Sequence, residues 1–121
     1  MVDAQNVDGT QTSPAAAIAN LLVGLFSEYT GRGPTRARAH LHEDIVTVDL
    51  RGTLTKAERT LAEHGRSDEV LRMRLAFQQT MRQDVARGVQ QILGREIEAF
   101  LSSNHLDPDI AVETFLLAPP E

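Results

Sequence analysis

Apolar residues after Ser13 recur every three or four positions, which is the spacing of one face of an amphipathic helix. Ser13 can cap the start of this helix, and Pro14 suits its first position. Gly31 can end the helix in a left-handed conformation, and Gly33, followed by a proline, prevents a continuation. The apolar face comprises Ile18, Leu21, Leu22, Leu25 and Tyr29. The pattern therefore predicts a helix from Pro14 to just before Gly31.

The next segment alternates strictly between apolar and polar residues, with the period of two that is typical of half-buried strands. This alternation predicts strands at residues 36–42 and 45–50. Residues 43–44 between them predict a tight hairpin turn. The type of this turn stays open, because the strong glycine signal of such turns is missing.

A second hairpin is predicted near the C-terminus, where residues 97–101 and 110–117 alternate in the same way. Asp107 and Pro108 between them are typical turn residues. We expect four apolar side chains of this hairpin to face the helices: Ile97, Leu101, Val112 and Leu116. With those four side chains facing the helices, Phe100 and Phe115 would lie on the outer face of the sheet.

Two helices are predicted between the hairpins. Thr55 and Glu58 have the spacing of a capping box and begin a short helix that stops at Gly65. Ser67 is expected to cap a second helix of about 25 residues, nearly 40 Å long, which ends at Gly94. Its predicted buried stripe is Val70, Met73, Phe77, Met81, Val85, Val89 and Ile92.

The order of these elements is α-β-β-α-α-β-β. Two hairpins among amphipathic helices predict an α+β fold, with helices packed on a mainly antiparallel four-stranded sheet. We expect one domain at residues 13–118. Residues 1–12 are polar and contain no Lys or Arg, so they are expected to form a disordered N-terminal tail rather than a secretory signal.

Composition and charge restrict the classes of function. Twelve basic and 17 acidic residues give a net charge of −5, which argues against nucleic acid as a partner. The absence of cysteine excludes disulfide frameworks, thiol nucleophiles and iron–sulfur clusters. The most apolar stretch, residues 14–26, is shorter than the roughly 20 residues of a membrane span. We therefore expect a cytoplasmic protein without a membrane span of its own.

Three histidines are candidate metal ligands. His40 and His42 lie two positions apart on a predicted strand, so their side chains point to the same side. His105 in the second hairpin turn could supply a third ligand to a transition metal. The alternative is a solvated polar face beside a turn whose aspartates bond their own backbone.

A short basic segment that contains two glycines, residues 31–36, is a candidate anion site. Arg32, Arg36 and Lys56 would be its ligands. The alternative is a helix stop followed by a strand entry, because the segment follows the negative C-terminal end of a helix. No serine lies in a nucleophile-elbow pattern, and we predict no catalytic residue and no cofactor.

Three of these segments occur together in one known family. Residues 29–34 (YTGRGP), 52–59 (GTLTKAER) and 104–109 (NHLDPD) appear in the order and spacing of a bacterial family of unknown function, described as Na⁺-translocating-system protein, MpsC-like. The chain resembles this family over roughly residues 21–118. The resemblance implies a link to a Na⁺-translocating or membrane-potential system. It supplies no catalytic residues.

Two functions are consistent with these observations. The first is a soluble, non-enzymatic accessory or regulatory protein that acts through protein–protein contacts, with a membrane protein as a candidate partner. The second is a small-ligand, anion or metal-binding domain that uses His40, His42 and His105.

A 40 Å helix exceeds the span of a compact domain of this size. We therefore expect a homodimer, joined through the long helix or through the face that carries Phe100 and Phe115.

Overall fold

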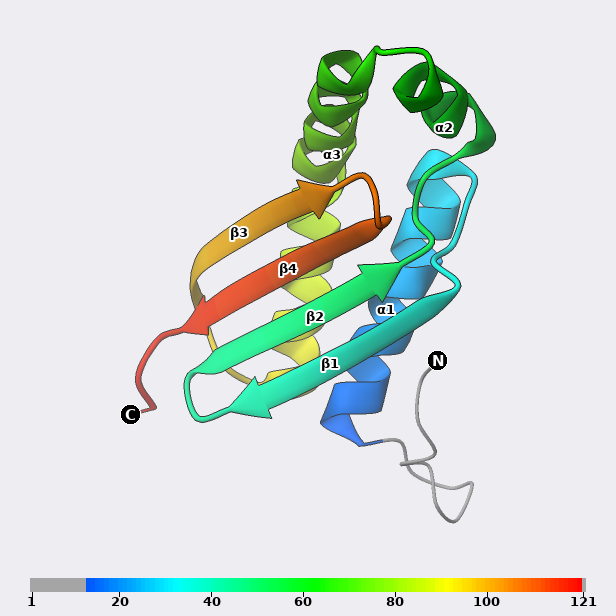
Figure 1. The fold of residues 1–121 in the computed structure, drawn as a ribbon. Helices are drawn as coiled ribbons and strands as arrows, with labels where there is room; N and C mark the ends of the chain where they lie inside the picture. The colour runs from blue at the N-terminus through cyan, green and yellow to red at the C-terminus, as the bar shows by residue number, and fades with distance from the viewer. Residues whose placement is uncertain (1–12, 121) are drawn as a thin grey trace.

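The computed structural model describes residues 13–120. They form a four-stranded antiparallel sheet of order β1-β2-β4-β3, with helices α1 and α3 packed across one of its faces (Figure 1). The elements are α1 (Pro14–Thr30), β1 (Arg36–His42), β2 (Ile45–Arg51), α2 (Lys56–Glu63), α3 (Ser67–Leu93), β3 (Ile97–His105) and β4 (Ile110–Leu117). The predicted α+β class and element order are confirmed. The tail predicted at residues 1–12 lies outside the described residues.

The helix ends follow local sequence signals at most positions. Ser13 Oγ accepts a hydrogen bond from Ala16 N at 3.1 Å, and the Thr55–Glu58 capping box is present in full. Gly94 ends α3 with φ 65°, in the left-handed region that favours glycine. Ser67 does not cap α3 as expected, because the helix already begins at this residue.

The hydrophobic core lies between the sheet and the helices. It includes Phe100 and Phe115, whose ring centroids are 4.4 Å apart. The expectation that these two rings lie on the outer face is wrong. In β4 the alternation is regular but has the opposite phase to the predicted one, so Phe115 faces the helices and Val112 and Leu116 face outward. In β3 a register shift between Ile97 and Ala99 inserts a bulge, and the extra residue moves every later residue to the opposite face, which places Phe100 in the core. Leu101 consequently points outward and is 55% exposed.

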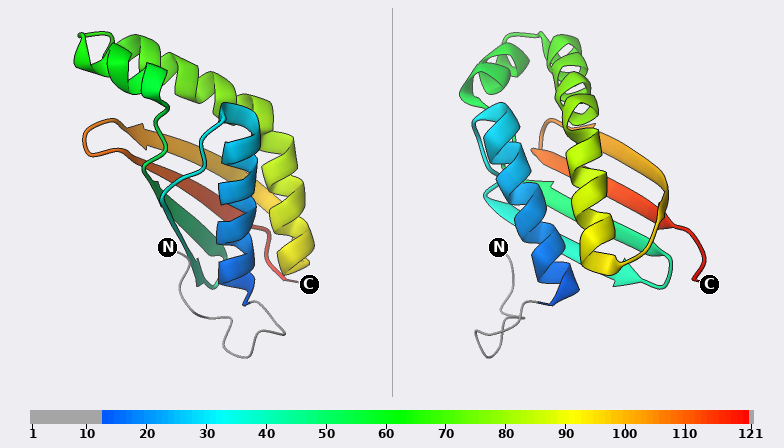
Figure 2. Two further views of the ribbon diagram at one scale, coloured as in Figure 1. Left: turned by 90° about the vertical axis from the view of Figure 1, so that its right-hand side faces the viewer. Right: turned by 180° about the vertical axis from the view of Figure 1, so that it is seen from behind.

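The buried stripe of α3 agrees with the sequence pattern only in part. Met81, Val85 and Val89 are buried as predicted. In the N-terminal half, however, two of the buried positions hold Arg74 and Gln78, whereas Met73 is exposed. This half of α3, together with α2, extends past the end of the sheet (Figure 2). None of the helices within residues 13–120 is long and apolar enough to span a membrane.

Candidate functional site

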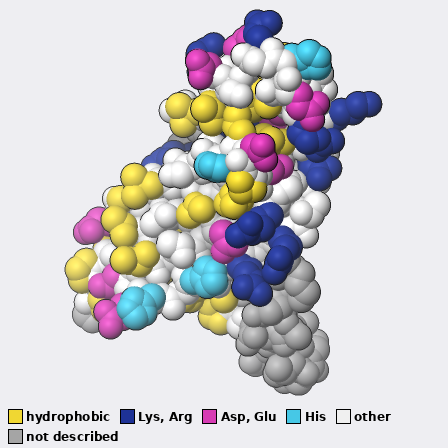
Figure 3. All heavy atoms as spheres, viewed as in Figure 1, with side chains coloured by type: hydrophobic (Ala, Val, Ile, Leu, Met, Phe, Trp, Pro, Cys, Tyr) yellow, Lys and Arg dark blue, Asp and Glu magenta, His cyan; other side chains and the backbone are white. Residues whose placement is uncertain are grey.

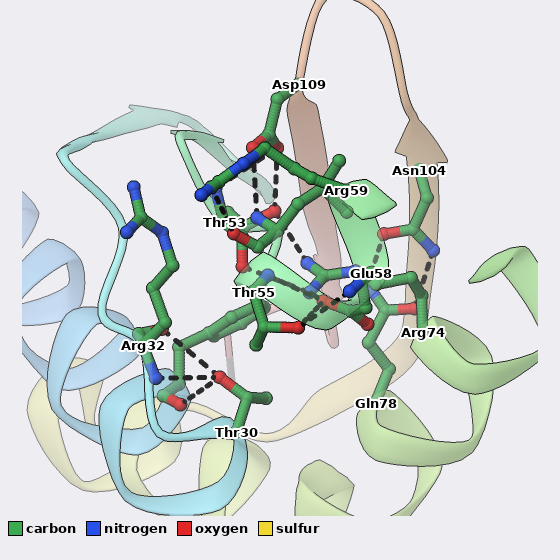
Figure 4. A network of polar contacts seen from close by, with 12 residues as sticks. Thr30, Arg32, Thr53, Thr55, Glu58, Arg59, Arg74, Gln78, Asn104 and Asp109 are labelled. Carbon is green, nitrogen blue, oxygen red and sulfur yellow. Dashed lines mark hydrogen bonds and ion pairs between the residues drawn. The ribbon is translucent and has the colours of Figure 1, made fainter. Parts of the chain in front are cut away.

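Asp109, where β4 begins, binds the segment that leads from β2 into α2. Its Oδ1 accepts hydrogen bonds from Thr53 N at 3.1 Å and from Thr53 Oγ1 at 2.9 Å. Its Oδ2 accepts a third bond from Leu54 N at 2.9 Å (Figure 4). A carboxylate that receives two backbone N–H groups holds that backbone firmly. Asp109 thereby fixes the start of α2 to the end of the sheet.

Arg74 reaches the same segment from α3 and is fully buried with its counterion. Its Nη1 lies 3.3 Å from Glu58 Oε1, and the two side chains are only 2% and 1% exposed. Its Nη2 donates to Thr53 Oγ1 at 2.7 Å, and Nη1 also donates to Thr53 O at 3.2 Å. The guanidinium lies 5.6 Å from the ring centroid of Phe26, within the range of a cation–π contact. Arg74 therefore joins α1, α2, α3 and the segment before α2 through one buried charge.

The C-terminal end of α1 joins this cluster through Arg32, whose Nε donates to Gly52 O at 2.9 Å. Gly52 has φ 69°, and a Cβ at this position would lie 2.3 Å from Thr35 Oγ1. Only glycine fits such a position without displacing its neighbour. We call the group formed by Arg32, Thr53, Glu58, Arg74 and Asp109 the polar anchor.

A second buried polar group lies between α3 and the sheet. Glu113 faces inward on β4, where Gln78 Nε2 donates to its Oε2 at 3.0 Å and the Ser102 hydroxyl donates to its Oε1. Gln78 also exchanges two hydrogen bonds with Asn104, at 3.0 and 2.8 Å. Burial raises the pKa of Glu113 to about 7, although the bonds from Ser102 and Gln78 and the positive charge of Arg74 oppose the increase. This carboxyl group therefore titrates near neutral pH.

The face of the sheet that α1 and α3 do not cover carries a mixed surface, which we call the open face. Its apolar side chains lie mainly on β4 and on the adjoining parts of β2 and β3 (Figure 3). They are Ile45, Ala99, Leu101, Ile110, Val112 and Leu116. Three arginines, Arg36, Arg38 and Arg51, gather at the opposite corner, where β1 begins and β2 ends. No segment within residues 13–120 covers this face (Figures 1 and 2).

The structure does not bring the three candidate metal ligands together. His40 and His42 lie on the same face of β1, the outer one, and His40 Nε2 lies 3.0 Å from Asp49 Oδ1. His105 lies on β3 at the other edge of the sheet. Three strand spacings of about 4.8 Å separate these edges, so more than about 14 Å separates His105 from the other two. Residues 13–120 contain no group of three or more potential metal-binding side chains, and metal binding by these histidines stays a prediction.

The candidate anion ligands lie on three different segments. Arg32 uses its Nε in the polar anchor, and Lys56 is exposed at the first position of α2. Arg36 lies on the open face, directly opposite Arg51. An anion site at these residues therefore stays a prediction.

A family model for MpsC, described as Na⁺-translocating membrane potential-generating system, matches residues 10–119. The chain belongs to the MpsC family. A search of the curated proteins and of the solved structures finds no match to it. The three segments on which the resemblance rests meet in this MpsC chain at one end of the sheet, where Arg32 contacts Gly52 and Asp109 contacts Thr53.

Sequence reasoning missed Arg74, Gln78 and Glu113, the three buried polar residues at the centre of these contacts. A signal for two of them exists in the MpsC chain. Extending the spacing of Met81, Val85 and Val89 backward by three and then four residues arrives at Gln78 and Arg74. The polar character of these residues led the prediction to the neighbouring apolar Met73 and Phe77 instead.

Proposed function

We propose that this MpsC chain is a non-enzymatic accessory or regulatory protein of a Na⁺-translocating or membrane-potential-generating system, and that it acts through protein–protein contacts on its open face. The observation that carries the proposal is the exposed apolar surface on the open face, with Leu101 55% and Ile45 42% exposed. Uncovered apolar surface of this kind marks interaction sites in soluble proteins. The family description supplies the link to ion translocation.

The polar anchor supports the same function. Its charged groups already bind one another: Asp109 receives three hydrogen bonds, and Arg74 binds both Glu58 and Thr53. Such groups stabilise the arrangement of the helices on the sheet and leave the open face as the surface available to a partner. We therefore assign the anchor a structural role.

We further propose that the protein works as a homodimer in the bacterial cytoplasm, with a membrane protein as its partner in the translocating system. The family description supports the membrane partner. The cysteine-free composition is compatible with a reducing compartment. The uncovered sheet face supports self-association, because twofold homodimers are the commonest closed assemblies.

A genetic complementation experiment tests the accessory function. The gene is deleted in its native host, and membrane potential and cellular Na⁺ are measured with a potential-sensitive dye and a Na⁺ indicator. We expect the wild-type gene to restore both, and Leu101→Glu to fail although its circular dichroism spectrum is unchanged. Leu75→Glu is the matched control, because Leu75 is 48% exposed on α3, away from the open face. Full restoration by Leu101→Glu, or a deletion without effect on either quantity, would contradict the proposal.

One observation supports the alternative of a small-ligand, anion or metal-binding domain. His40 and His42 share one face of β1, and Asp49 lies beside His40. Calorimetry with Zn²⁺ and Ni²⁺ on the purified protein, compared with His40→Ala and His42→Ala, tests this alternative. Micromolar binding that both variants abolish would favour it over the accessory function.

A further inference from the structure

The open face has a regular geometry that restricts what can cover it. Its outward residues form rows across the four strands, and each row contains one residue from β1, β2, β4 and β3. The row at one end contains Arg36, Arg51 and Ile110. The row at the other end contains Ile45 and Leu116 and lies next to the β1–β2 turn. The two ends of the face therefore differ in charge.

The arginine end is mainly positive, because it holds three arginines and one carboxylate, that of Asp49, which lies opposite Arg38. Arg36 and Arg51 are directly opposite each other in neighbouring strands, and like charges in that position repel. Within residues 13–120, neither Arg36 nor Arg38 takes part in an ion pair. Asp49, the one acidic residue in these rows, is shared between His40 at 3.0 Å and Arg51 at 4.0 Å. A partner that brings carboxylates to this end would relieve the repulsion.

The chain itself carries such carboxylates at the opposite end of the same two strands. Glu43 and Asp44 form the β1–β2 turn. Arg95 already binds Asp44 at 2.7 Å, whereas Glu43 is exposed and takes part in no ion pair among the described residues. Figure 3 shows basic side chains gathered on the right of the face, with acidic side chains both beside them and on the left, where the turn is. The exposed Glu43 of one copy therefore matches the mainly positive end of a second copy that is turned end for end.

We propose that the open face binds the open face of a second copy of this chain, about a twofold axis that is perpendicular to the strands. This inference rests on the proposed function, because it names the partner of the same surface. The axis keeps each strand over its counterpart and reverses its direction. Ile110 of one copy then lies over Leu116 of the other, Arg38 lies over His40, and Arg36 lies over His42, next to the turn that contains Glu43. An axis parallel to the strands would instead place Arg36 and Arg38 over His105 and Ser103 of β3, and neither of these residues is acidic.

The size of the face predicts a weak dimer. β1 and β2 are each seven residues long, and four strands at about 4.8 Å spacing and about 3.4 Å per residue cover roughly 450 Å². Two copies would bury on the order of 900 Å², below the roughly 1,600 Å² of standard interfaces. We therefore expect a dimer with a dissociation constant in the micromolar range.

Sedimentation equilibrium tests whether a second copy of the chain covers the open face. Wild-type protein at about 1 to 500 µM, a range chosen for a weak interface, should change from the mass of one chain to that of two. Leu101→Glu should remain at the mass of one chain, and Leu75→Glu should dimerise as the wild type does. A wild-type mass of one chain at every concentration would overturn the inference. Loss of the dimer in Leu75→Glu with retention in Leu101→Glu would also overturn it, since the interface would then be on α3.

A charge reversal tests the direction of the axis. Arg36→Glu and Glu43→Lys should each weaken the dimer about tenfold, because each places like charges across the interface. The double variant exchanges the two charges and should dimerise within about threefold of the wild type. A double variant as weak as the sum of the single variants would overturn the proposed axis. A monomeric wild type that still complements the deletion strain would remove this inference and the proposed homodimer, and would leave the proposed accessory function intact.

Discussion

The buried ion pair of Arg74 and Glu58 offers the most quantitative test of the polar anchor. Replacing Arg74 with Met keeps a long apolar side chain but leaves the Glu58 carboxylate buried without its counterion. Glu58 Oε2 already has no hydrogen-bond partner among the described residues, so the carboxylate has no alternative cation. Breaking a fully buried pair in this way typically costs about 3–5 kcal/mol. A domain of this size is stable by only about 5–15 kcal/mol, so Arg74→Met should remove about a fifth or more of the total.

Urea unfolding, followed by circular dichroism, measures this loss. With a slope of about 1–2 kcal/mol/M, the urea midpoint should fall by about 1.5 M or more. Arg87→Met is the matched control, because Arg87 lies on the same helix and forms an exposed pair with Asp84 at 3.1 Å. An exposed pair contributes at most about 1 kcal/mol. Adding Glu58→Gln to Arg74→Met should recover about 1–2 kcal/mol, because it removes the unpaired charge. A loss below about 1 kcal/mol in Arg74→Met would refute the structural role of the pair.

Three further predictions concern the core and the turns. Burial holds the folded-state pKa of Glu113 at about 7, above its usual value of 4.5. The free energy of unfolding of the wild type should therefore fall by up to about 3 kcal/mol as the pH rises from about 4.5 to 7. Glu113→Gln should abolish this pH dependence in urea unfolding, and an unchanged dependence would contradict the assignment. Phe115→Ala should lower the free energy of unfolding by about 3–5 kcal/mol, and Phe77→Ala should lower it clearly less, since Phe115 is fully buried and Phe77 only half-buried. Thermal unfolding measures both losses, and the reverse order would show that the buried face of α3 is assigned wrongly. Gly52→Ala should destabilise the protein more than Gly65→Ala does, although both glycines have positive φ, because only Gly52 lies against a neighbouring side chain. Equal losses of stability in urea unfolding would contradict this prediction.

The element order could be predicted because local signals determine it. Alternation of period two marked the four strands, and Ser13, Gly31, Thr55 and Gly94 marked the helix ends. The face of the sheet that each β3 side chain occupies could not be predicted in the same way. The register shift between Ile97 and Ala99 depends on how β3 pairs with β4, and alternation within one strand carries no information about it.

The site could be predicted only as separate pieces. The segments at residues 29–34, 52–59 and 104–109 were singled out from the sequence, but their contacts join residues as far apart as Thr53 and Asp109. Arg74 was missed because a buried charge is the opposite of what a hydrophobic pattern identifies. Its burial follows from the two partners, Glu58 and Thr53, that tertiary structure brings to it.

The central claim is that the open face makes the protein contacts of this MpsC chain. Position-specific photo-cross-linking in the native host tests it most directly, with a photoreactive amino acid placed at Leu101, at Leu116 and, as a control, at Leu75. Leu101 and Leu116 lie on the open face, and Leu75 lies on α3. We expect adducts from Leu101 and Leu116, including one of twice the chain mass, and none from Leu75. Adducts from Leu75 alone, or from none of the three positions, would contradict the account.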